Sequence, residues 1–248
     1  MKTSGNKTVV IDLFNDNRPE VDNDCAVVAI DVIRATTTAV TGVALGRQCF
    51  PVSSITEAMS LAKRLVNPLL VGELGGNMPY GFDMQNSPAL LETRTDIDRP
   101  MILLSTSGTR LMTEFRHKDA LYVACLRNFK ALAAHLLAHH PKIALLGAAT
   151  RGEFREEDQL CCAWIAEEVI GQGYQPENEM TAQIVRRWSG ACIDAICQGN
   201  SAAYLQRSGQ VGDLDFILAH VNDLNFVYQY SNGRIIERAL ETDDAKLA

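Results

Sequence analysis

The chain has 248 residues, of which 47% are hydrophobic and 21% charged, and its formal net charge at pH 7 is −7. This composition is typical of a globular protein with a large core, and it excludes a disordered chain. The acidic balance and the lack of any lysine cluster argue against nucleic acid as a partner.

Apolar runs rich in β-branched residues alternate with helical patterns up to Ile170. Such alternation favours a mostly parallel sheet with helices on both faces. The predicted strands are Thr8–Phe14, Cys25–Ile30, Cys49–Val52, Leu69–Gly72, Met101–Leu104, Ala120–Ala124 and Ile143–Gly147. The predicted helices are Thr37–Leu45, Thr56–Val66, Gly108–Phe115, Asn128–Ala138 and Glu156–Ile170. We therefore predict an α/β fold with three layers, α/β/α, and a mostly parallel, mixed-edge sheet.

The pattern changes after Gly171. Further helices and a hairpin are predicted at Met180–Cys197, Ser201–Arg207, and Asn225–Tyr230 with Arg234–Arg238 across Ser231–Gly233. Because the composition does not shift at Gly171, we expect a single domain, residues 1–248, with 171–248 as appended helices and hairpin. The hairpin is expected either to form a dimer surface or to cover a sheet edge, and a homodimer is the default expectation.

The two ends of the chain and its cysteines indicate the compartment. Met1–Thr8 lacks the apolar core of a signal peptide, and no uncharged stretch is long enough to span a bilayer. Several of the seven cysteines lie in apolar runs, where reduced core cysteines are usual. We expect a cytoplasmic protein without a membrane segment, and a frayed tail at Thr242–Ala248.

Polar residues collect where predicted strands end. They are Asp31, Arg34 and Thr36–Thr38 after the second strand, Glu73 and Gly75–Asp83 after the fourth, Ser105–Arg110 after the fifth, and Ala148–Asp158 after the seventh. In an open α/β sheet, ligands bind outside the carboxyl ends of the strands. We therefore predict that these residues lie at one edge of the sheet and form a binding site.

The residue types suit a cation next to an anion. Asp31 and Glu73 can converge on a hard cation such as Mg²⁺, which prefers one or two carboxylates. Ser105–Thr109 opens a predicted helix, where backbone N–H groups favour an anion. The guanidinium groups of Arg34, Arg110 and Arg151 can clamp anionic groups.

Each of these features also has a purely structural interpretation. The Ser-Thr-Ser-Gly run is often only a helix cap, and an aspartate at a strand end is often a turn former. The acidic cluster Glu153–Asp158 is also compatible with a charge bias in the first turn of a helix. The argument for a site therefore depends on the convergence of all the features on one face.

Several common enzyme signatures are excluded by spacing. A haloacid-dehalogenase phosphatase needs a second aspartate two residues after Asp31, where Ile33 stands. A cysteine phosphatase needs an arginine six residues after its cysteine, but Ala131 follows Cys125 at that distance. The chain also lacks a Walker lysine, a dinucleotide glycine fingerprint and zinc-ligand spacing.

Five segments, in order, resemble the motifs of the 2-phosphosulfolactate phosphatases, Mg²⁺-dependent enzymes of the coenzyme M pathway. The segments are Asp31–Thr38, Gly72–Gly76, Gly81–Asp83 with Asn86–Pro88, Ser105–Thr109 and Gly152–Asp158. The resemblance implies a three-layer α/β/α fold. It also implies hydrolysis of (2R)-2-phospho-3-sulfolactate to 3-sulfolactate and phosphate.

With this resemblance, the residues are given the following expected roles. Mg²⁺ is held by Asp31, Glu73 and Asp158, and Arg34 stabilises the transferring phosphoryl group. Asp158 or Asp83 activates water or accepts the phosphoryl group. The substrate is bound by Arg34, Thr36, Thr37, Ser105, Thr106, Ser107, Gly108, Thr109, Arg110 and Arg151.

The chain departs from the family pattern at three positions. Ser107 stands where asparagine is usual, Leu74 where a basic residue is usual and Gln85 where glycine is usual. Two alternatives therefore stay open. One is a phosphatase or phosphotransferase of a different phosphorylated metabolite, and the other is a non-catalytic anion-binding or regulatory protein on the same fold.

Overall fold

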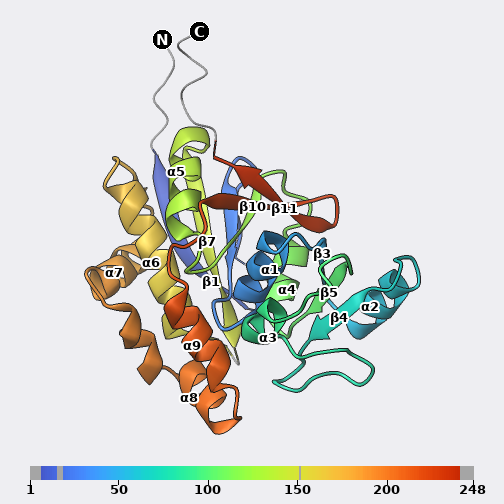
Figure 1. Ribbon diagram of the computed structural model, residues 1–248. Coiled ribbons are helices and arrows are strands. Elements are labelled where there is room, and N and C mark those ends of the chain that lie inside the picture. The colour runs from blue at the N-terminus through green and yellow to red at the C-terminus, as the bar shows by residue number, and fades with distance from the viewer. Residues whose placement is uncertain (1–6, 16–18, 151, 241–248) are drawn as a thin grey trace.

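The computed structural model describes residues 7–15, 19–150 and 152–240. The described residues form one mixed sheet with helices on both of its faces (Figure 1). Its strands are β1 (Thr8–Phe14), β2 (Ala26–Ile30), β3 (Cys49–Val52), β4 (Leu69–Gly72), β5 (Met101–Leu104), β6 (Leu121–Ala124), β7 (Lys142–Thr150), β8 (Glu153–Phe154), β9 (Gln175–Pro176), β10 (Phe226–Ser231) and β11 (Arg234–Ala239). The predicted strands are thus present.

The helices are α1 (Ala35–Ala44), α2 (Ile55–Ala62), α3 (Pro88–Glu92), α4 (Gly108–Glu114), α5 (Phe129–His139), α6 (Glu156–Ile170), α7 (Glu179–Trp188), α8 (Asn200–Arg207) and α9 (Val211–Ala219), with a 3₁₀ helix at Ile193–Gln198. The prediction of one helix over Met180–Cys197 is wrong. Helix α7 ends at Trp188, and Gly190 then takes a left-handed φ of 69° that breaks the helix. The sequence patterns also missed α3 and α9.

Alternate residues of β2 enter two different cores, as expected for a strand that is buried on both faces. Val28 and Ile30 pack with the helices α5 and α6 on one side. Val27 and Ala29 pack with α1 and α4 on the other side. The predicted three-layer α/β/α fold is confirmed.

The sheet contains two groups of parallel strands that run in opposite directions. The strand order is β4-β5-β3-β11-β10-β6-β2-β7-β1-β9, and β8 pairs with β7. The antiparallel hairpin β10–β11 lies between the groups, with β11 next to β3 and β10 next to β6. Because three successive pairings are antiparallel, β3, β4 and β5 run opposite to β6, β2 and β7 along the sheet.

Despite this opposition, the two groups share a core. Helices α1, α3 and α4 lie between them (Figure 1), and one cluster of buried side chains includes Ala29 of β2, Leu103 of β5 and Leu111 of α4. Sheet twist of about 20–25° per strand accumulates across the hairpin. The sheet therefore curls around these helices, and the carboxyl ends of β2, β4, β5 and β7 can approach each other.

The hairpin occupies the middle of the sheet. From the sequence, we expected it to form a dimer surface or to cover an edge of the sheet. Its turn is Asn232–Gly233, whose φ values of 51° and 80° fit a two-residue hairpin turn. Tyr228 and Ile235 are buried, as expected for strands that have a neighbouring strand on each side. The antiparallel strands of the mixed sheet thus join its two halves.

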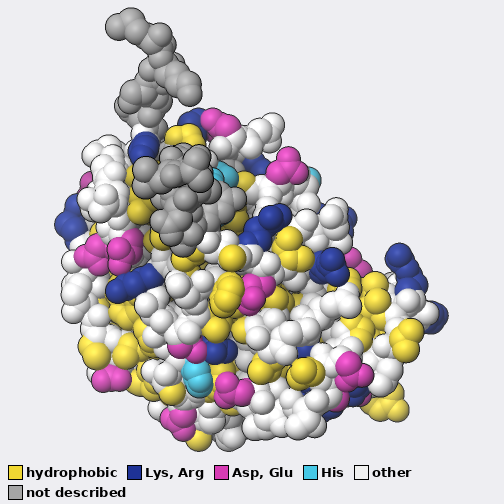
Figure 2. All heavy atoms as spheres, turned by 45° about the horizontal axis from the view of Figure 1, so that its top comes forward, with side chains coloured by type: hydrophobic (Ala, Val, Ile, Leu, Met, Phe, Trp, Pro, Cys, Tyr) yellow, Lys and Arg dark blue, Asp and Glu magenta, His cyan; other side chains and the backbone are white. Residues whose placement is uncertain are grey.

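Three sequence-based expectations are not decided by the fold. The expected tail Thr242–Ala248 lies outside the described residues. Homodimer formation and a cytoplasmic location stay predictions. Among the described helices, none has the length and apolar character needed to cross a bilayer. Figure 2 shows basic and acidic side chains interspersed on the face that it displays.

A histidine pair at the end of α5 should make folding stability sensitive to acid. The Tyr122 hydroxyl lies 2.9 Å from Nε2 of His135 and 2.8 Å from Nε2 of His140. Burial, with a smaller contribution from His139, lowers the pKa of His135 from 6.5 to about 4. Below pH 6.5 the unfolded chain therefore binds a proton at His135, whereas the folded chain binds it only near pH 4. The free energy of unfolding therefore falls as the pH is lowered from 6.5 toward 4.

We predict that His135→Gln reduces the loss of stability between pH 7 and pH 5, measured as the shift of the urea midpoint. The exposed His117 provides a control, since His117→Gln should leave the shift as it is in the original chain. Equal shifts in the original chain and in His135→Gln would contradict the assignment.

Candidate functional site

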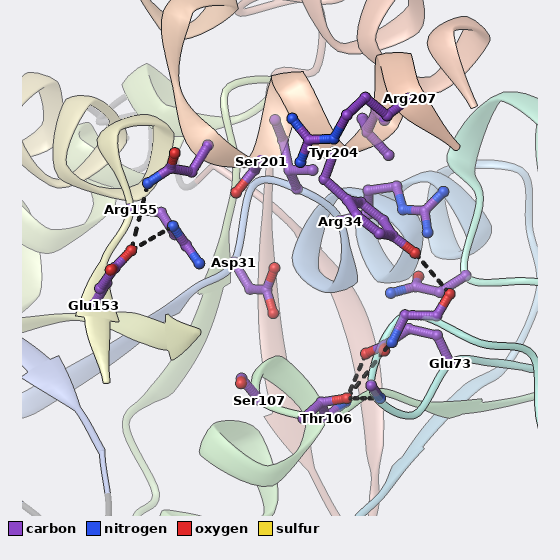
Figure 3. Close-up of a pocket in the computed structure, with 16 residues that line it drawn as sticks. Asp31, Arg34, Glu73, Thr106, Ser107, Glu153, Arg155, Ser201, Tyr204 and Arg207 are labelled. Carbon is purple, nitrogen blue, oxygen red and sulfur yellow. Dashed lines mark hydrogen bonds and ion pairs between the residues drawn. The ribbon is translucent and has the colours of Figure 1, made fainter. Parts of the chain in front are cut away.

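A cavity of about 420 Å³ opens where the ends of β2, β4, β5 and β7 meet helix α8 (Figure 3). Asp31 and Arg34 follow β2, Glu73 follows β4, Thr106 and Ser107 follow β5. Residues from both oppositely running groups of strands thus line one cavity. The predicted convergence of strand ends is present, although the four strands are not all parallel to each other.

The segment between β2 and α1 is folded by its own hydroxyl groups. Thr36 Oγ1 donates to the carbonyl oxygen of Asp31 at 2.8 Å and accepts from the Asp31 amide at 3.0 Å. Thr37 Oγ1 donates to the carbonyl oxygen of Val32 at 2.7 Å. These hydroxyls therefore fix the turn that presents Asp31 and Arg34. The prediction that Thr36 and Thr37 bind substrate is not supported, because neither residue lines the cavity.

Asp31 is the carboxylate at the centre of the view in Figure 3. Its Oδ1 accepts from the Ala35 amide at 3.3 Å. A Cβ on Gly108 would lie only 2.3 Å from Asp31 Oδ2, so glycine is needed for this close approach. Burial raises the pKa of Asp31 to about 6, with a further contribution from the Glu73 charge, against the lowering effect of nearby amides and Arg34.

Arg34 is buried and anchored by the C-terminal part of the chain. Its Nη1 donates to Asp213 Oδ2 and to Gln210 Oε1, both at 2.5 Å. Within the described residues, no recorded hydrogen bond uses its Nη2 or Nε. One edge of the guanidinium is thus fixed by the protein, and the other edge is available for an anion in the cavity.

Asp213 also holds the start of α3. Its Oδ1 accepts from Ser87 Oγ at 2.6 Å and from the Ala89 amide at 3.1 Å. This buried carboxylate therefore joins α9, α3 and the segment after β2. No motif in the sequence indicated this role, because Asp213 lies about 180 residues after Arg34.

Glu73 organises the loop between β4 and α3. Its Oε1 accepts from the Thr106 amide at 2.7 Å, and its Oε2 accepts from Thr106 Oγ1 at 2.9 Å and the Gly76 amide at 2.8 Å. Thr106 Oγ1 accepts from the Gly75 amide at 2.8 Å. These bonds tie the loop after β4 to the end of β5, so that both line the cavity.

Several residues predicted to bind substrate do not line the cavity. Ser105 and Thr109 bond each other at the start of α4: the Thr109 amide donates to Ser105 Oγ at 2.9 Å and the Ser105 amide to Thr109 Oγ1 at 2.8 Å. Arg110 lies on the exposed face of that helix. Gly108 lies against Asp31. Ser107, by contrast, lines the cavity, and its Oγ donates to the Ala149 carbonyl oxygen at 2.6 Å. Arg151 lies outside the described residues.

The two carboxylates predicted to activate water are also outside the cavity lining. Asp158 Oδ1 accepts from the Val32 amide at 2.7 Å. It therefore holds the backbone directly after Asp31 without lining the cavity itself. Burial raises the pKa of Asp158 well above its usual range, as do the charges of Glu157 and Asp31. Asp83 Oδ2 accepts from the Leu70 amide at 2.8 Å and pairs with Arg99 at 3.1 Å, which places it beside β4 away from the cavity.

The predicted metal ligands converge only in part. Among the described residues, no group of three or more His, Cys, Asp or Glu side chains is arranged to hold a metal ion. Asp31 and Glu73 line the cavity, whereas Asp158 does not. A carboxylate offers about four lone-pair positions, and the three recorded hydrogen bonds of Glu73 leave one. The donors on offer in the described part of the cavity are thus Asp31 and one remaining lone-pair position of Glu73, within the one or two carboxylates that Mg²⁺ uses beside several waters.

The sequence patterns missed much of the cavity. Arg155 lies directly before α6 and pairs with Glu153 at 2.6 Å, within the motif Gly152–Asp158, whose carboxylates carry the expected roles. Asn86 stands in the motif Asn86–Pro88, for which the residue types alone indicate no role. Ser201, Tyr204 and Arg207 come from α8, where nothing in the sequence distinguished a binding helix from a covering one.

Fold and cavity together define a three-layer α/β/α protein with a candidate anion-binding active site at the ends of its parallel strands. A family model described as 2-phosphosulpholactate phosphatase matches residues 12–233. The chain therefore belongs to the 2-phosphosulpholactate phosphatase family.

Individual relatives support this assignment. A protein of Carboxydothermus hydrogenoformans is 39% identical over 147 residues, which are 59% of this chain and 61% of the relative. A protein of Symbiobacterium thermophilum is 31% identical over 218 residues, which are 84% of this chain and 92% of the relative. A Gloeobacter violaceus protein is 28% identical over 205 residues, 81% of this chain and 86% of the relative. Each is described as a probable 2-phosphosulfolactate phosphatase.

The buried ion pair gives a stability prediction. Asp213→Ala leaves the Arg34 guanidinium buried without its carboxylate, and we expect a loss of about 3–5 kcal/mol in the free energy of unfolding. Asp215→Ala, on an exposed position of the same helix, is the matched control and should have little effect. The double variant Arg34→Met with Asp213→Leu should lose less than Asp213→Ala alone, because it leaves no buried charge.

Urea unfolding of the three variants measures these differences. A free energy of unfolding for Asp213→Ala within about 1 kcal/mol of the original chain would show that the pair is not the constraint described here.

Proposed function

We propose that the protein is a phosphatase that hydrolyses 2-phosphosulfolactate to 3-sulfolactate and inorganic phosphate. The observation that carries the proposal is that a carboxylate, Asp31, and a guanidinium, Arg34, stand on one short segment and line the same cavity. The family membership of residues 12–233 and the names of the relatives support the same substrate.

Arg34 is the residue that we assign to the phosphoryl group. Its Nη1 is held by Asp213 and Gln210, so the guanidinium is oriented before a ligand arrives. As negative charge develops on the phosphoryl oxygens in the transition state, a guanidinium that is already oriented stabilises it without having to move. The anchoring is thus the feature that suits Arg34 to catalysis as well as to binding.

Asp31 is the carboxylate that we assign to the chemical step. In hydrolysis the water oxygen forms a bond to phosphorus and the bond from phosphorus to the ester oxygen breaks. One proton of the water ends on that ester oxygen, which leaves as the hydroxyl group of 3-sulfolactate, and the other stays on the phosphate. Asp31 lines the cavity and Asp158 and Asp83 do not, which supports our assignment of the attacking water to Asp31. Asp158 acts behind it by holding the Val32 amide.

We also propose Mg²⁺ as the cofactor, held by Asp31 and Glu73. When bound, Mg²⁺ offsets the negative charge of a phosphate ester. The support is the donor set: two cavity-lining carboxylates from different strands, one of which has its pKa raised by burial and by the charge of the other. A non-catalytic anion binder would gain nothing from these two negative charges.

The proposal predicts phosphate release from 2-phosphosulfolactate that requires Mg²⁺ and stops with EDTA. Asp31→Asn and Arg34→Met should each lower kcat/KM by at least about 100-fold, since each removes a charged group that contacts the reacting phosphoryl group. Glu168→Gln, an exposed position on α6, is the control and should retain activity.

Calorimetry of Mg²⁺ binding separates the roles. Asp31→Asn and Glu73→Gln should both weaken Mg²⁺ binding, whereas Arg34→Met should not. No phosphate release from 2-phosphosulfolactate or from a panel of other phosphorylated small acids, with Asp31→Asn equal to the original chain, would favour a binding protein and overturn the proposal. Release from another member of the panel only would identify a phosphatase of a different metabolite.

A further inference from the structure

Helix α8 forms the wall of the cavity opposite the residues that follow β5. Figure 3 shows Ser201, Tyr204 and Arg207 above the cavity, and Thr106 and Ser107 below it. The Tyr204 hydroxyl donates to the Gly76 carbonyl oxygen at 2.9 Å, and a Cβ on Gly76 would lie 2.4 Å from that hydroxyl. This contact holds α8 against the loop after β4, so the wall is a fixed part of the cavity.

Of the described residues, three arginines line the cavity with their guanidinium groups, and these differ in their partners. Arg34 pairs with Asp213 and Arg155 pairs with Glu153. For Arg207, no ion pair or hydrogen bond is recorded within residues 7–15, 19–150 and 152–240. Among the described residues, the positive charge of Arg207 is therefore not matched by a carboxylate, and we take it as available for a ligand.

Asn86 provides a second, independent observation. Its side chain lines the same cavity and is only 2% exposed. Its Oδ1 has no hydrogen-bond partner in the described part of the protein. The next residue, Ser87, bonds Asp213, which fixes the backbone here. A buried amide without a partner is costly, and such a group in a cavity lining indicates that a ligand completes it.

We propose that Arg207 and Asn86 form a subsite that binds the sulfonate of the substrate, at the opposite end from the phosphate. The inference rests on the proposed function and adds the residues that select the substrate. Arg34 and Asp31 are assigned to the phosphate ester. The sulfonate, a second strong anion on the same short carbon chain, must therefore bind to other hydrogen-bond donors. The Arg207 guanidinium and Asn86 Nδ2, which also has no hydrogen-bond partner among the described residues, are suitable donors for the oxygens of a sulfonate. Asn86 Oδ1 is an acceptor, so its partner in the complex is a bound water and not the sulfonate.

Two substrates that differ only in the sulfonate test the subsite. The original chain should prefer 2-phosphosulfolactate over 2-phospholactate. Arg207→Met should lower kcat/KM for 2-phosphosulfolactate by about 10- to 100-fold, mainly through KM, as expected for the loss of a hydrogen bond to a charged group. It should leave kcat/KM for 2-phospholactate unchanged. Arg64→Met, at an exposed position after α2, is the matched control.

Equal losses on both substrates, or no loss on either, would overturn the assignment. Phosphate and carboxylate are present in both substrates, so equal losses would place Arg207 on one of those groups or in the fold.

Asn86→Leu tests the second residue by its effect on the urea midpoint, which would fall if the role of Asn86 were structural. Because the amide has no protein partner to lose, the urea midpoint should stay the same or rise. The kcat/KM for 2-phosphosulfolactate should fall while that for 2-phospholactate does not. A lower urea midpoint together with equal losses on both substrates would show a structural asparagine and contradict the proposal.

Calorimetry without turnover keeps this proposal separate from the proposed phosphatase activity. The original chain should bind 3-sulfolactate more tightly than lactate, and Arg207→Met should remove the difference. If no phosphate is released from any substrate but this difference depends on Arg207, the subsite stands and the phosphatase proposal fails. If the original chain does not distinguish 3-sulfolactate from lactate, the subsite is wrong.

Discussion

The buried Asp213 carboxylate connects the parts of the protein that surround the cavity. It receives the Arg34 guanidinium, the Ser87 hydroxyl and the Ala89 amide on its two oxygens. A charge this deeply buried is tolerated only with a partner of opposite sign and with its remaining lone pairs satisfied. The position of α9 is therefore coupled to the orientation of Arg34, and the C-terminal part of the chain helps to shape the candidate active site.

The hairpin has a comparable role at the level of the sheet. Strands β10 and β11 connect two groups of parallel strands that run in opposite directions, and the shared core around α1, α3 and α4 holds the groups against each other. This arrangement brings Glu73 and Thr106 from one group to the same cavity as Asp31 and Arg155 from the other. The cavity thus depends on residues 226–239 even though none of them lines it.

Local patterns predicted most strands and helices because burial on both faces and helix periodicity leave clear signals in short windows of sequence. The middle position of the hairpin had no such signal, since Tyr228 and Ile235 would be apolar in an edge strand as well. At the site, Asp31, Arg34 and Glu73 were predicted from their positions after strands. Thr36, Thr37 and Asp158 have the right chemistry but are used to hold the backbone around Asp31. Spacing along the chain does not reveal the roles of Asn86, Arg207 and Asp213, because each role arises only when segments far apart in the sequence come together in the fold.

A crystal structure of the protein with orthovanadate, an analogue of phosphate, tests the central claim most directly. We expect the oxyanion in the cavity, with Nη2 or Nε of Arg34 donating to it, Arg34 Nη1 still bonded to Asp213, and Asp31 beside it. An oxyanion bound in the cavity without contact to Arg34, or bound only elsewhere on the protein, would contradict the assignment of Asp31 and Arg34 as the centre of the site.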